Sequence, residues 1–407
     1  MFVPITYNLR SLWVRKSATL LTVFGIGATV AIISGVLALQ QGFKTMFTAG
    51  GRADVAVFLR PGANSEGDSQ FSRELGLQLI KSVPEIAVSP EQGPIASMEA
   101  YLAVLLAPSR GGLTNVPLRG VQPMSFEIRK NELRVVEGRN FTPGTDEVIV
   151  GSRLVDRIQH CRLGDAIQIN MTPFRVVGIF EHAGAFGGEV WGDLDRFMAT
   201  MDRYGPNRII AKLKPGTDVG APDPMEAFGS DEPPSPAPGT LAARLREDPE
   251  IPAKVMTEKQ YLESMTVMLS YTLIGLGFIL ALIMGLGAVF TATNTMLSAL
   301  AARTREIGIL LAMGYRPIPI FLSFMLEAVL LGLIGGLVGC VLALPFNGLE
   351  TGTMNFQTFT EMTFAFRVTW QLLVLAVIFS LALGLLGGAW PAWRAARLRP
   401  THAMRRE

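Results

Sequence analysis

The stretch AARTREIGILLAMGYRP, residues 301–317, separates two of the most apolar runs of the chain. Arg303, Arg305 and Glu306 lie within four residues of one another, and Arg316 follows after a short apolar face. Charges at this density are costly in the hydrocarbon core of a bilayer. The stretch is therefore expected outside the bilayer, as a connection between two membrane-spanning segments.

The composition of the whole chain favours a membrane protein. Of its 407 residues, 49% are hydrophobic and only 17% are charged, and the mean hydropathy is +0.35. A helix needs roughly 20 apolar residues to cross a bilayer. Four runs of the chain are long enough and lack charged residues, except for Glu327 in the third run. We predict four transmembrane α-helices at residues 17–43, 264–302, 317–349 and 368–393.

The first apolar run has a competing interpretation as a signal peptide, because Arg10, Arg15 and Lys16 precede it. The run is longer than the apolar region of a signal peptide, which has about 7–15 residues. It also ends in LQQGFKTMF rather than in small residues typical of a cleavage site. We therefore expect it to be retained as a helix.

The distribution of basic residues predicts the orientation. Segments 1–16, 303–316 and 394–407 together hold 11 of the 36 basic residues and 2 of the 34 acidic ones, whereas residues 44–263 hold 24 basic and 29 acidic residues. Basic residues accumulate on the cytoplasmic side of membrane proteins. We expect an inner (cell) membrane protein with an amphipathic N-terminal segment, both termini and 303–316 in the cytoplasm. Residues 44–263 and the loop 350–367 would then lie outside.

The segment 44–263 has the pattern of a large extracytoplasmic α+β domain, with one or two subdomains. Strands are expected at 53–59, 99–107, 146–151, 165–170, 174–181 and 207–213, and helices at 72–83, 193–205 and 241–248. The stretch 215–239 contains PPSPAPG and is expected to be a flexible insertion outside the core. The first span should continue outward through 40–47, and the second should begin outside at about Glu258, so that the two form a stalk.

The sequence offers no chemistry for an enzyme active site. Its three histidines, including the His160–Cys161 pair, have no spacing typical of metal ligands. The chain lacks a P-loop motif, and the glycine-rich stretches 25–30 and 285–290 fall inside predicted spans, where a dinucleotide site would be out of context. An intramembrane enzyme would need a paired catalytic set, which the spans do not carry. Cys161 is expected outside the membrane and Cys340 within it, so no disulfide is predicted. No metal or bound cofactor is predicted for this chain either.

Small residues recur every fourth position in the predicted spans, which allows helix backbones to approach closely in lipid. These residues are Gly277, Ala281 and Gly285, then Gly332 and Gly336, then Gly384 and Gly388. The stripes favour a packed bundle or a dimer seam over a pore. Glu327 must face the bundle, an interface or an aqueous edge. It is either a conformational coupling element or a protonated or hydrogen-bonded structural residue.

Several of these stretches together resemble the FtsX/MacB-type ABC transporter permeases, including a DevC-like exporter branch. The sequence from 302 to 339 is similar to the R-x-x-E-I-G-x-L-x-A-x-G segment of that family, followed by a glutamate in the next helix. The start NLRSLWVRKSATLLTVFGI and the external EVIVGSRLVDRIQHCRLGDAIQI also resemble it. The tail matches the family's closing pattern through Pro391, Ala392, Ala395, Ala396, Pro400, Ala403 and Arg405.

The resemblance implies a permease subunit that works with a separate ABC ATP-binding subunit, which would bind ATP and Mg²⁺. The family's docking role falls on Arg303, Arg305, Glu306 and Gly308. The neighbouring apolar face of Ile307, Leu310 and Leu311 would suit a protein groove. The competing interpretation is a loop that serves only the positive-inside rule, although Glu306 adds nothing to that rule. Further expected partners are a second permease copy, a periplasmic adaptor protein and membrane lipid, but no nucleic acid.

Two functions remain open from the sequence. The first is mechanotransmission, in which ATP hydrolysis by the partner moves the external domain to export or extract a lipid, lipoprotein, peptide or drug. The second is a transmembrane signal transducer that regulates an external partner such as a cell-wall hydrolase. The sequence does not decide between them, and it does not name the substrate.

Overall fold

The computed structural model describes residues 16–398, except residues 110, 183, 225–233, 315 and 355–360. The chain divides into two compact units. The helical unit comprises the described parts of Met1–Gly42, Ser270–Leu349 and Ala365–Glu407, and the α+β unit comprises those of Phe43–Leu269 and Glu350–Phe364. The predicted N-terminal segment 1–16, except Lys16, and the tail beyond Leu398 lie outside the described residues.

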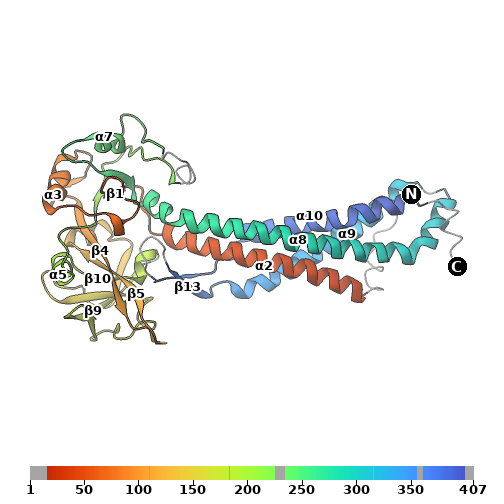
Figure 1. Ribbon diagram of the computed structural model, residues 1–407, viewed down its shortest axis with the longest axis horizontal. Coiled ribbons are helices and arrows are strands. Elements are labelled where there is room, and N and C mark those ends of the chain that lie inside the picture. The colour runs from red at the N-terminus through yellow and green to blue at the C-terminus, as the bar shows by residue number, and fades with distance from the viewer. Residues whose placement is uncertain are drawn as a thin grey trace. The chain divides into compact units, whose positions relative to one another are not determined.

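Four helices of the described chain are long and apolar enough to cross a membrane. They are α2 (Lys16–Thr48), α8 (Glu258–Ala312), α9 (Pro317–Ala343, continued by the short 3-10 helix η3, Leu344–Phe346) and α10 (Trp370–Ala396) (Figure 1). Each corresponds to one predicted span. As predicted, α2 continues past residue 43 and α8 begins at Glu258.

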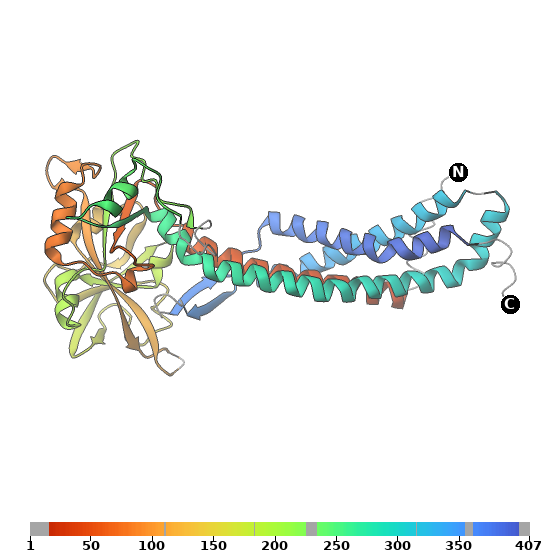
Figure 2. The same ribbon diagram turned by 45° about the horizontal axis from the view of Figure 1, so that its top comes forward.

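The helix α8 is longer than the sequence predicted. Residues 303–312 do not form a separate coupling helix but continue α8 without a break, as Figure 2 shows. The 55 residues of α8 contain no proline, so nothing forces the helix to stop at residue 302. The helix ends where Gly314 adopts a left-handed φ of 90°, and Pro317 then occupies the first turn of α9.

Side chains from all four long helices form the core of the helical unit. Val23 of α2, Met296 of α8, Phe324 of α9 and Ala392 of α10 belong to one buried cluster. The helices α9 and α10 run side by side in both ribbon views.

The α+β unit is built on a ten-stranded sheet in the order β12-β1-β11-β4-β5-β10-β7-β9-β6, with β8 paired to β9. The pairs β5–β10 and β7–β9 are parallel and the other pairs are antiparallel. The strands are β1 (Val55–Leu59), β4 (Ala96–Leu106), β5 (Thr114–Val121), β6 (Leu133–Gly138), β7 (Glu147–Gly151), β8 (Ala166–Ile169), β9 (Thr172–His182), β10 (Val190–Asp193), β11 (Arg208–Lys212) and β12 (Lys254–Thr257). Every predicted strand is present.

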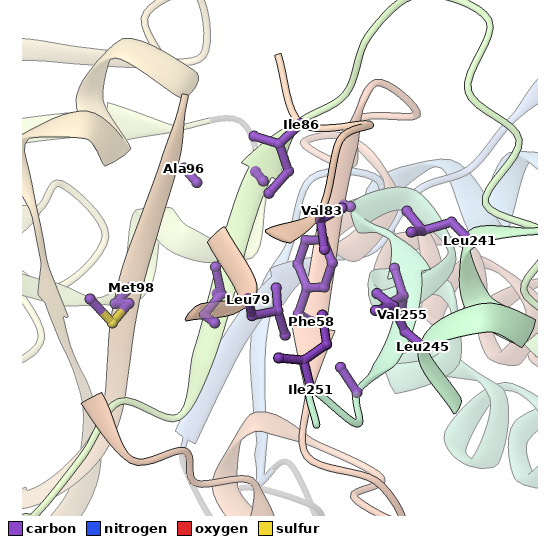
Figure 3. Packing of buried hydrophobic residues seen from close by; sticks show 14 of the residues in the cluster. Phe58, Leu79, Val83, Ile86, Ala96, Met98, Leu241, Leu245, Ile251 and Val255 are labelled. Atoms are coloured by element: carbon purple, nitrogen blue, oxygen red, sulfur yellow. The ribbon is translucent and has the colours of Figure 1, made fainter. Parts of the chain in front are cut away.

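Helices cover the sheet and complete two hydrophobic clusters. The helices are α3 (Arg73–Ser82), α4 (Pro123–Ile128), α5 (Leu194–Thr200) and α7 (Leu241–Glu247). In the first cluster, Phe58 of β1 packs with Leu79 of α3 and Leu245 of α7 (Figure 3). The second cluster consists of side chains from β4, β5, β7, β8, β9, β10 and α5 and from the segment 154–161. A third buried cluster, which includes Phe180 of β9 and Trp191 of β10, lies on the same continuous sheet.

Two predicted connections differ from their description in the sequence. Within 215–239, Val219 is 4% exposed and belongs to the first cluster. Ala237 N donates to Gly220 O at 3.0 Å and connects the two ends of the stretch. The central residues 225–233 lie outside the described chain. The predicted loop 350–367 contains two paired strands, β13 (Glu350–Met354) and β14 (Glu361–Ala365).

Candidate functional site

The corner between α8 and α9 carries the residues that the sequence assigned to ATPase docking. Met313 N donates to Ile309 O at 2.9 Å and Gly314 N donates to Leu311 O at 3.1 Å, which closes the last turn of α8. Arg316 is extended and caps the start of α9. The chain therefore reverses within a few residues, and its sharp turn depends on the left-handed Gly314.

The four predicted docking residues do not share one surface. Arg305 and Glu306 are exposed, whereas Gly308 is buried. The side chain of Arg303 is 12% exposed and faces Glu327 of α9. The exposed residues of the corner therefore include Arg305 and Glu306, Ile309, which is 44% exposed, and Met313, which is 64% exposed.

The predicted apolar face of the corner is used mainly by the bundle itself. Ile307 is 4% exposed and belongs to the helical core, and Leu311 packs against the same core. The expectation that Ile307 and Leu311 present a face to a partner groove is therefore wrong. Their burial places Arg305 and Glu306 outward, because residues on opposite sides of a helix face opposite directions.

Glu327 is paired inside the helical unit. Its Oε2 atom lies 3.2 Å from Arg303 Nη1, and the two side chains are 4% and 12% exposed. The pair joins the end of α8 to α9, so two residues that the sequence analysis treated separately form one contact. Burying an unpaired carboxylate in an apolar environment would cost several kcal/mol, and a nearby guanidinium offsets that cost.

The glycine stripes of α9 and α10 face each other within the chain. A side chain at Gly332 would approach Ser380 O to 2.7 Å, and one at Gly336 would approach Ser380 Oγ to 2.0 Å. On the facing helix α10, a Cβ added at Gly384 would lie 2.6 Å from Ala328 O, and one added at Gly388 would lie 2.2 Å from Ala328 Cβ. Only glycine allows this approach, as expected for small-residue helix contacts in lipid.

The stripe of α8 is less closely packed. A Cβ at Gly277 would lie 3.5 Å from Val36 of α2, which is ordinary van der Waals contact, and one at Gly285 would lie 3.3 Å from Leu383 of α10. Ala281 is half-buried between them. These residues face α2 and α10 but do not require the absence of a side chain as Gly332 and Gly388 do.

The histidines and cysteines give no metal site in the described part of the chain. Cys161 and Cys340 are both buried and both free. Burial raises the pKa of the Cys161 thiol to about 12, so it is a poor nucleophile at neutral pH. His402 lies outside the described residues.

A buried cluster of charges in the α+β unit was not predicted from the sequence. We call it the ion cluster; its seven members are each at most 5% exposed. They are Glu66 (η1, Glu66–Asp68), Glu99 (β4), Arg119 (β5), Arg129 (after α4), Glu189 (before β10), Arg208 (β11) and Glu258 (first residue of α8).

Glu99 and Arg119 are at the centre of the ion cluster. Arg119 forms a two-pronged pair with Glu189, at 2.6 and 2.7 Å, and another with Glu66, at 2.8 and 2.9 Å. Glu99 Oε2 accepts a hydrogen bond from Arg208 Nη2 at 2.6 Å. The two residues can pair because they lie directly opposite each other in the β11–β4 register. Such charge-assisted pairs are stronger than neutral hydrogen bonds.

Arg129 connects this centre to α8. Its Nη1 atom lies 2.8 Å from Glu99 Oε1, and its Nη2 atom lies 2.9 Å from Glu258 Oε1. The guanidinium also lies over the ring of Phe186, at 4.9 Å from its centroid. The guanidinium carbon of Arg119 also lies 4.9 Å from the centroid of the Phe186 ring, so a single aromatic ring contacts both cations.

The electrostatics at the centre of the ion cluster favour the charged forms of Glu99 and Arg119. Burial raises the pKa of Glu99, but attraction by Arg129, Arg208 and Arg119 outweighs this effect and holds the pKa well below its usual range. Burial lowers the pKa of Arg119, but Glu189 and Glu66 raise it well above the ordinary value. The pairing therefore compensates for the loss of water around these groups.

The strands contained a signal for the ion cluster. Glu99 and Arg119 are the single charges of β4 and β5, and Arg208 begins β11, whose only other charge is Lys212 at its end; the residues of these strands are mostly buried. A charge on a strand buried on both faces needs a partner nearby. The sequence alone could not pair these residues, because their partners lie far away along the chain.

A cavity of about 690 Å³ also opens in the α+β unit. Its lining includes Met46, Tyr101, Arg153, Glu189 and Glu350. Burial lowers the pKa of Arg153, and Glu350 opposes that shift. The lining mixes apolar groups with both signs of charge and so does not specify one class of ligand.

Comparisons with known proteins agree with both parts of the fold. Residues 19–221 match the model of the MacB-like periplasmic core domain, and residues 277–400 match that of the FtsX-like permease C-terminal domain. The macrolide export ATP-binding/permease protein MacB of Nitrosomonas europaea is 28% identical over 98% of this chain, which spans only 58% of that relative. The ABC transporter permease YknZ of Bacillus subtilis is 25% identical over 99% of this chain and 98% of its own length.

Among solved structures, the periplasmic region of MacB from Actinobacillus actinomycetemcomitans covers 52% of this chain and 91% of that structure. Its sequence identity is 13% and its TM-score is 0.35, which is too low to support an argument. The two family matches and the apolar helices are sufficient. The chain therefore belongs to the FtsX/MacB-type ABC transporter permeases and is a multi-pass membrane protein.

Proposed function

We propose that this chain is a permease subunit that transmits the work of a separate ATPase to its own α+β unit. The MacB relative carries ATP-binding and permease functions in its name, and this chain spans 58% of its length. The YknZ relative is named a permease and matches this chain over 98% of its own length. In this proposal a separate ATP-binding subunit, carrying ATP and Mg²⁺, supplies the energy.

The observation that carries the proposal is the continuity of α2 and α8. The helix α2 contributes residues up to Gly42 to the helical unit and Phe43–Thr48 to the α+β unit, and α8 is divided between the units at Leu269. An unbroken helix of 55 residues rises roughly 80 Å. Rigid secondary elements of this kind can carry a displacement from one site to another.

The proposed topology has four spans, with the corner of α8 and α9 and both termini in the cytoplasm of the cell (inner) membrane. The asymmetry of basic residues supports it, because 303–316 and the terminal segments hold 11 basic and 2 acidic residues. The α+β unit would then work outside the cytoplasm. A second permease copy and a periplasmic adaptor are proposed partners, and the transported class is a lipid, lipoprotein, peptide or drug.

We assign ATPase docking to the exposed part of the corner, Arg305, Glu306 and Ile309. A central apolar contact flanked by charges is typical of protein interfaces. Arg303 would not contact the ATPase directly but would support this surface, since its contact with Glu327 joins the end of α8 to α9. A force applied to the corner would then act on both α8 and α9.

The docking assignment is tested by Glu306→Lys in the complex reconstituted with its ATPase. We expect a reduced ATPase rate and weaker copurification of the two subunits, because the substitution reverses a charge at the proposed interface. Glu91→Lys, the same change at an exposed residue of the α+β unit, is the matched control. If Glu306→Lys assembles and hydrolyses ATP as the control does, the docking assignment is wrong.

A further inference from the structure

The start of α8 is fixed to the sheet by more than the peptide chain. The strand β12 ends at Thr257 and α8 begins at the next residue, Glu258. A peptide link alone could act as a hinge, because two backbone dihedrals remain soft at each residue. The contacts around the first turn of α8 determine whether this junction bends.

A capping box fixes the first turn. Thr257 N donates to Gln260 Oε1 at 3.0 Å, and Gln260 N donates to Thr257 Oγ1 at 3.2 Å. This reciprocal pair is the helix-start pattern of a threonine followed three residues later by glutamine. In addition, Lys259 N donates to Arg52 O at 3.1 Å. The first-turn amides of Lys259 and Gln260 therefore have partners.

Glu258 and Tyr261 attach the same turn to the ion cluster. They are three residues apart and so lie on one face of α8. Glu258 pairs with Arg129 at 2.9 Å, and Tyr261 Oη accepts from Glu66 N at 3.1 Å. Glu258 is 0% exposed and Tyr261 is 1% exposed. The first turn thus reaches β4 through Arg129 and Glu99, and it reaches β11 through Arg208, which lies over the Tyr261 ring at 5.9 Å.

The end of α2 within the α+β unit is attached differently. Phe43 packs against Phe47 at 5.0 Å and against Phe364 of β14 at 5.2 Å, measured between ring centroids. These contacts are apolar and prefer an edge-to-face geometry, but they lack the donor–acceptor directions of an ion pair, so we expect them to tolerate small sliding movements better. Pairs between guanidinium and carboxylate groups have a fixed geometry and lose energy when the partners turn.

We propose that the ion cluster is a rigid joint that makes α8, rather than α2, the helix that moves the α+β unit. Arg129 and Tyr261 are positioning residues in this joint. The Arg129–Glu258 pair holds the direction of α8 relative to the sheet, so a displacement of α8 reaches the sheet without bending at residue 257. The functional part of this inference rests on the proposed force transmission, whereas the rigidity of the joint does not.

The rigidity is tested by distances between spin labels in the full chain in lipid nanodiscs, with Cys161 and Cys340 replaced by alanine. One label replaces Tyr204, which is 85% exposed, and the other replaces Met268 of α8, which is 54% exposed. Glu258→Gln keeps the shape of the side chain but removes its charge. We expect it to broaden the 204–268 distance distribution by about twofold, because the junction gains freedom to bend.

Three comparisons make the result specific. Tyr261→Phe removes only the hydroxyl that Glu66 N contacts and should broaden the same distribution, whereas Glu263→Gln, on α8 outside the ion cluster, should not. A label pair at residues 204 and 44 reports on the end of α2 and should stay unchanged in all variants. Equal distributions in Glu258→Gln and wild type would overturn the proposal. Equal broadening of both label pairs would also overturn it, since the cluster would then serve only the folding of the unit.

The link to function has a separate readout. In the complex with the ATPase, nucleotide should change amide hydrogen exchange in β4 and β11 of the wild type. Glu258→Gln should lose this change while it keeps its ATPase rate. If nucleotide leaves exchange in the wild type unchanged, force transmission is wrong while the joint stands on the distance data. If Glu258→Gln responds to nucleotide as the wild type does, the proposed role of α8 is wrong.

Discussion

At the scale of single residues, Glu99 has the most demanding position in the α+β unit. It is 0% exposed and lies within 3.4 Å of nitrogen atoms of Arg119, Arg129 and Arg208. Ser125 Oγ donates to it as well, at 2.8 Å. Removing this carboxylate would leave two or three buried guanidinium groups without their full compensation. Losing one partner of a buried ion pair costs far more free energy than the intact pair contributes to stability, because the remaining charges stay desolvated.

We therefore predict that Glu99→Gln lowers the free energy of unfolding of the α+β unit by about 3–5 kcal/mol at neutral pH. Amide hydrogen exchange of β4, β5 and β11 in the full chain measures this loss locally. Glu147→Gln is the control. It removes a pair with Arg139, whose side chain is 56% exposed, and surface pairs contribute about 0–1 kcal/mol. Similar effects of the two substitutions would contradict the central role of Glu99.

The same residues predict the response to acid. The pKa values of Glu66 and Glu99 are lowered in the folded chain from an ordinary value of 4.5, because attraction by the arginines outweighs the effect of burial. Below pH 4.5 the unfolded chain binds protons that the folded chain does not bind, so their stabilising contribution is full above this pH and declines below it. Protection of β4 should therefore decline below pH 4.5 in the wild type and decline less steeply in Glu99→Gln. Parallel pH profiles would contradict this assignment.

At the scale of elements, sequence patterns located the four spans and six strands of the sheet, but they missed β5, β6, β10 and β12 and the end of α8. Apolar length identified α2, α8, α9 and α10, and short β-like runs identified β1 and β9. The charges Arg303, Arg305 and Glu306 suggested a break at residue 303, but α8 continues because helix propensity and core contacts of Ile307 favour it. The ion cluster escaped prediction because its pairs, such as Glu66–Arg119, join distant parts of the chain.

The contact between α9 and α10 depends on glycine at defined positions. A Cβ at Gly332 would lie 2.7 Å from the backbone oxygen of Ser380, and a backbone atom cannot rotate away. Gly332→Ala should therefore separate the helices and destabilise the helical unit by about 1–3 kcal/mol. The midpoint of thermal unfolding of the purified protein measures the effect. Gly287→Ala in α8 is the control, because no atom lies within 4 Å of its added Cβ. A normal midpoint for Gly332→Ala would show that α9 and α10 are not closely packed.

At the scale of the whole molecule, function depends on which side of the membrane each end of α8 reaches. The start of α8 belongs to the α+β unit and its end leads into the corner with α9. Force transmission from a cytoplasmic ATPase requires these two ends to lie on opposite sides. The distribution of basic residues predicts this arrangement. Direct labelling of the two ends is therefore the decisive measurement.

We predict that a single cysteine at position 204 reacts with a membrane-impermeant maleimide from outside the cell membrane, and that a cysteine at position 313 reacts only after permeabilisation. Tyr204 and Met313 are 85% and 64% exposed, so both positions are accessible within the chain. The two native cysteines are buried, and the pKa of Cys161 is raised to about 12. Their replacement by alanine should leave no background. Labelling of position 313 in sealed, right-side-out vesicles would place the corner outside, and an ATPase in the cytoplasm could not then dock on Glu306. Labelling of position 204 only after permeabilisation would contradict the extracytoplasmic location of the α+β unit in the same way.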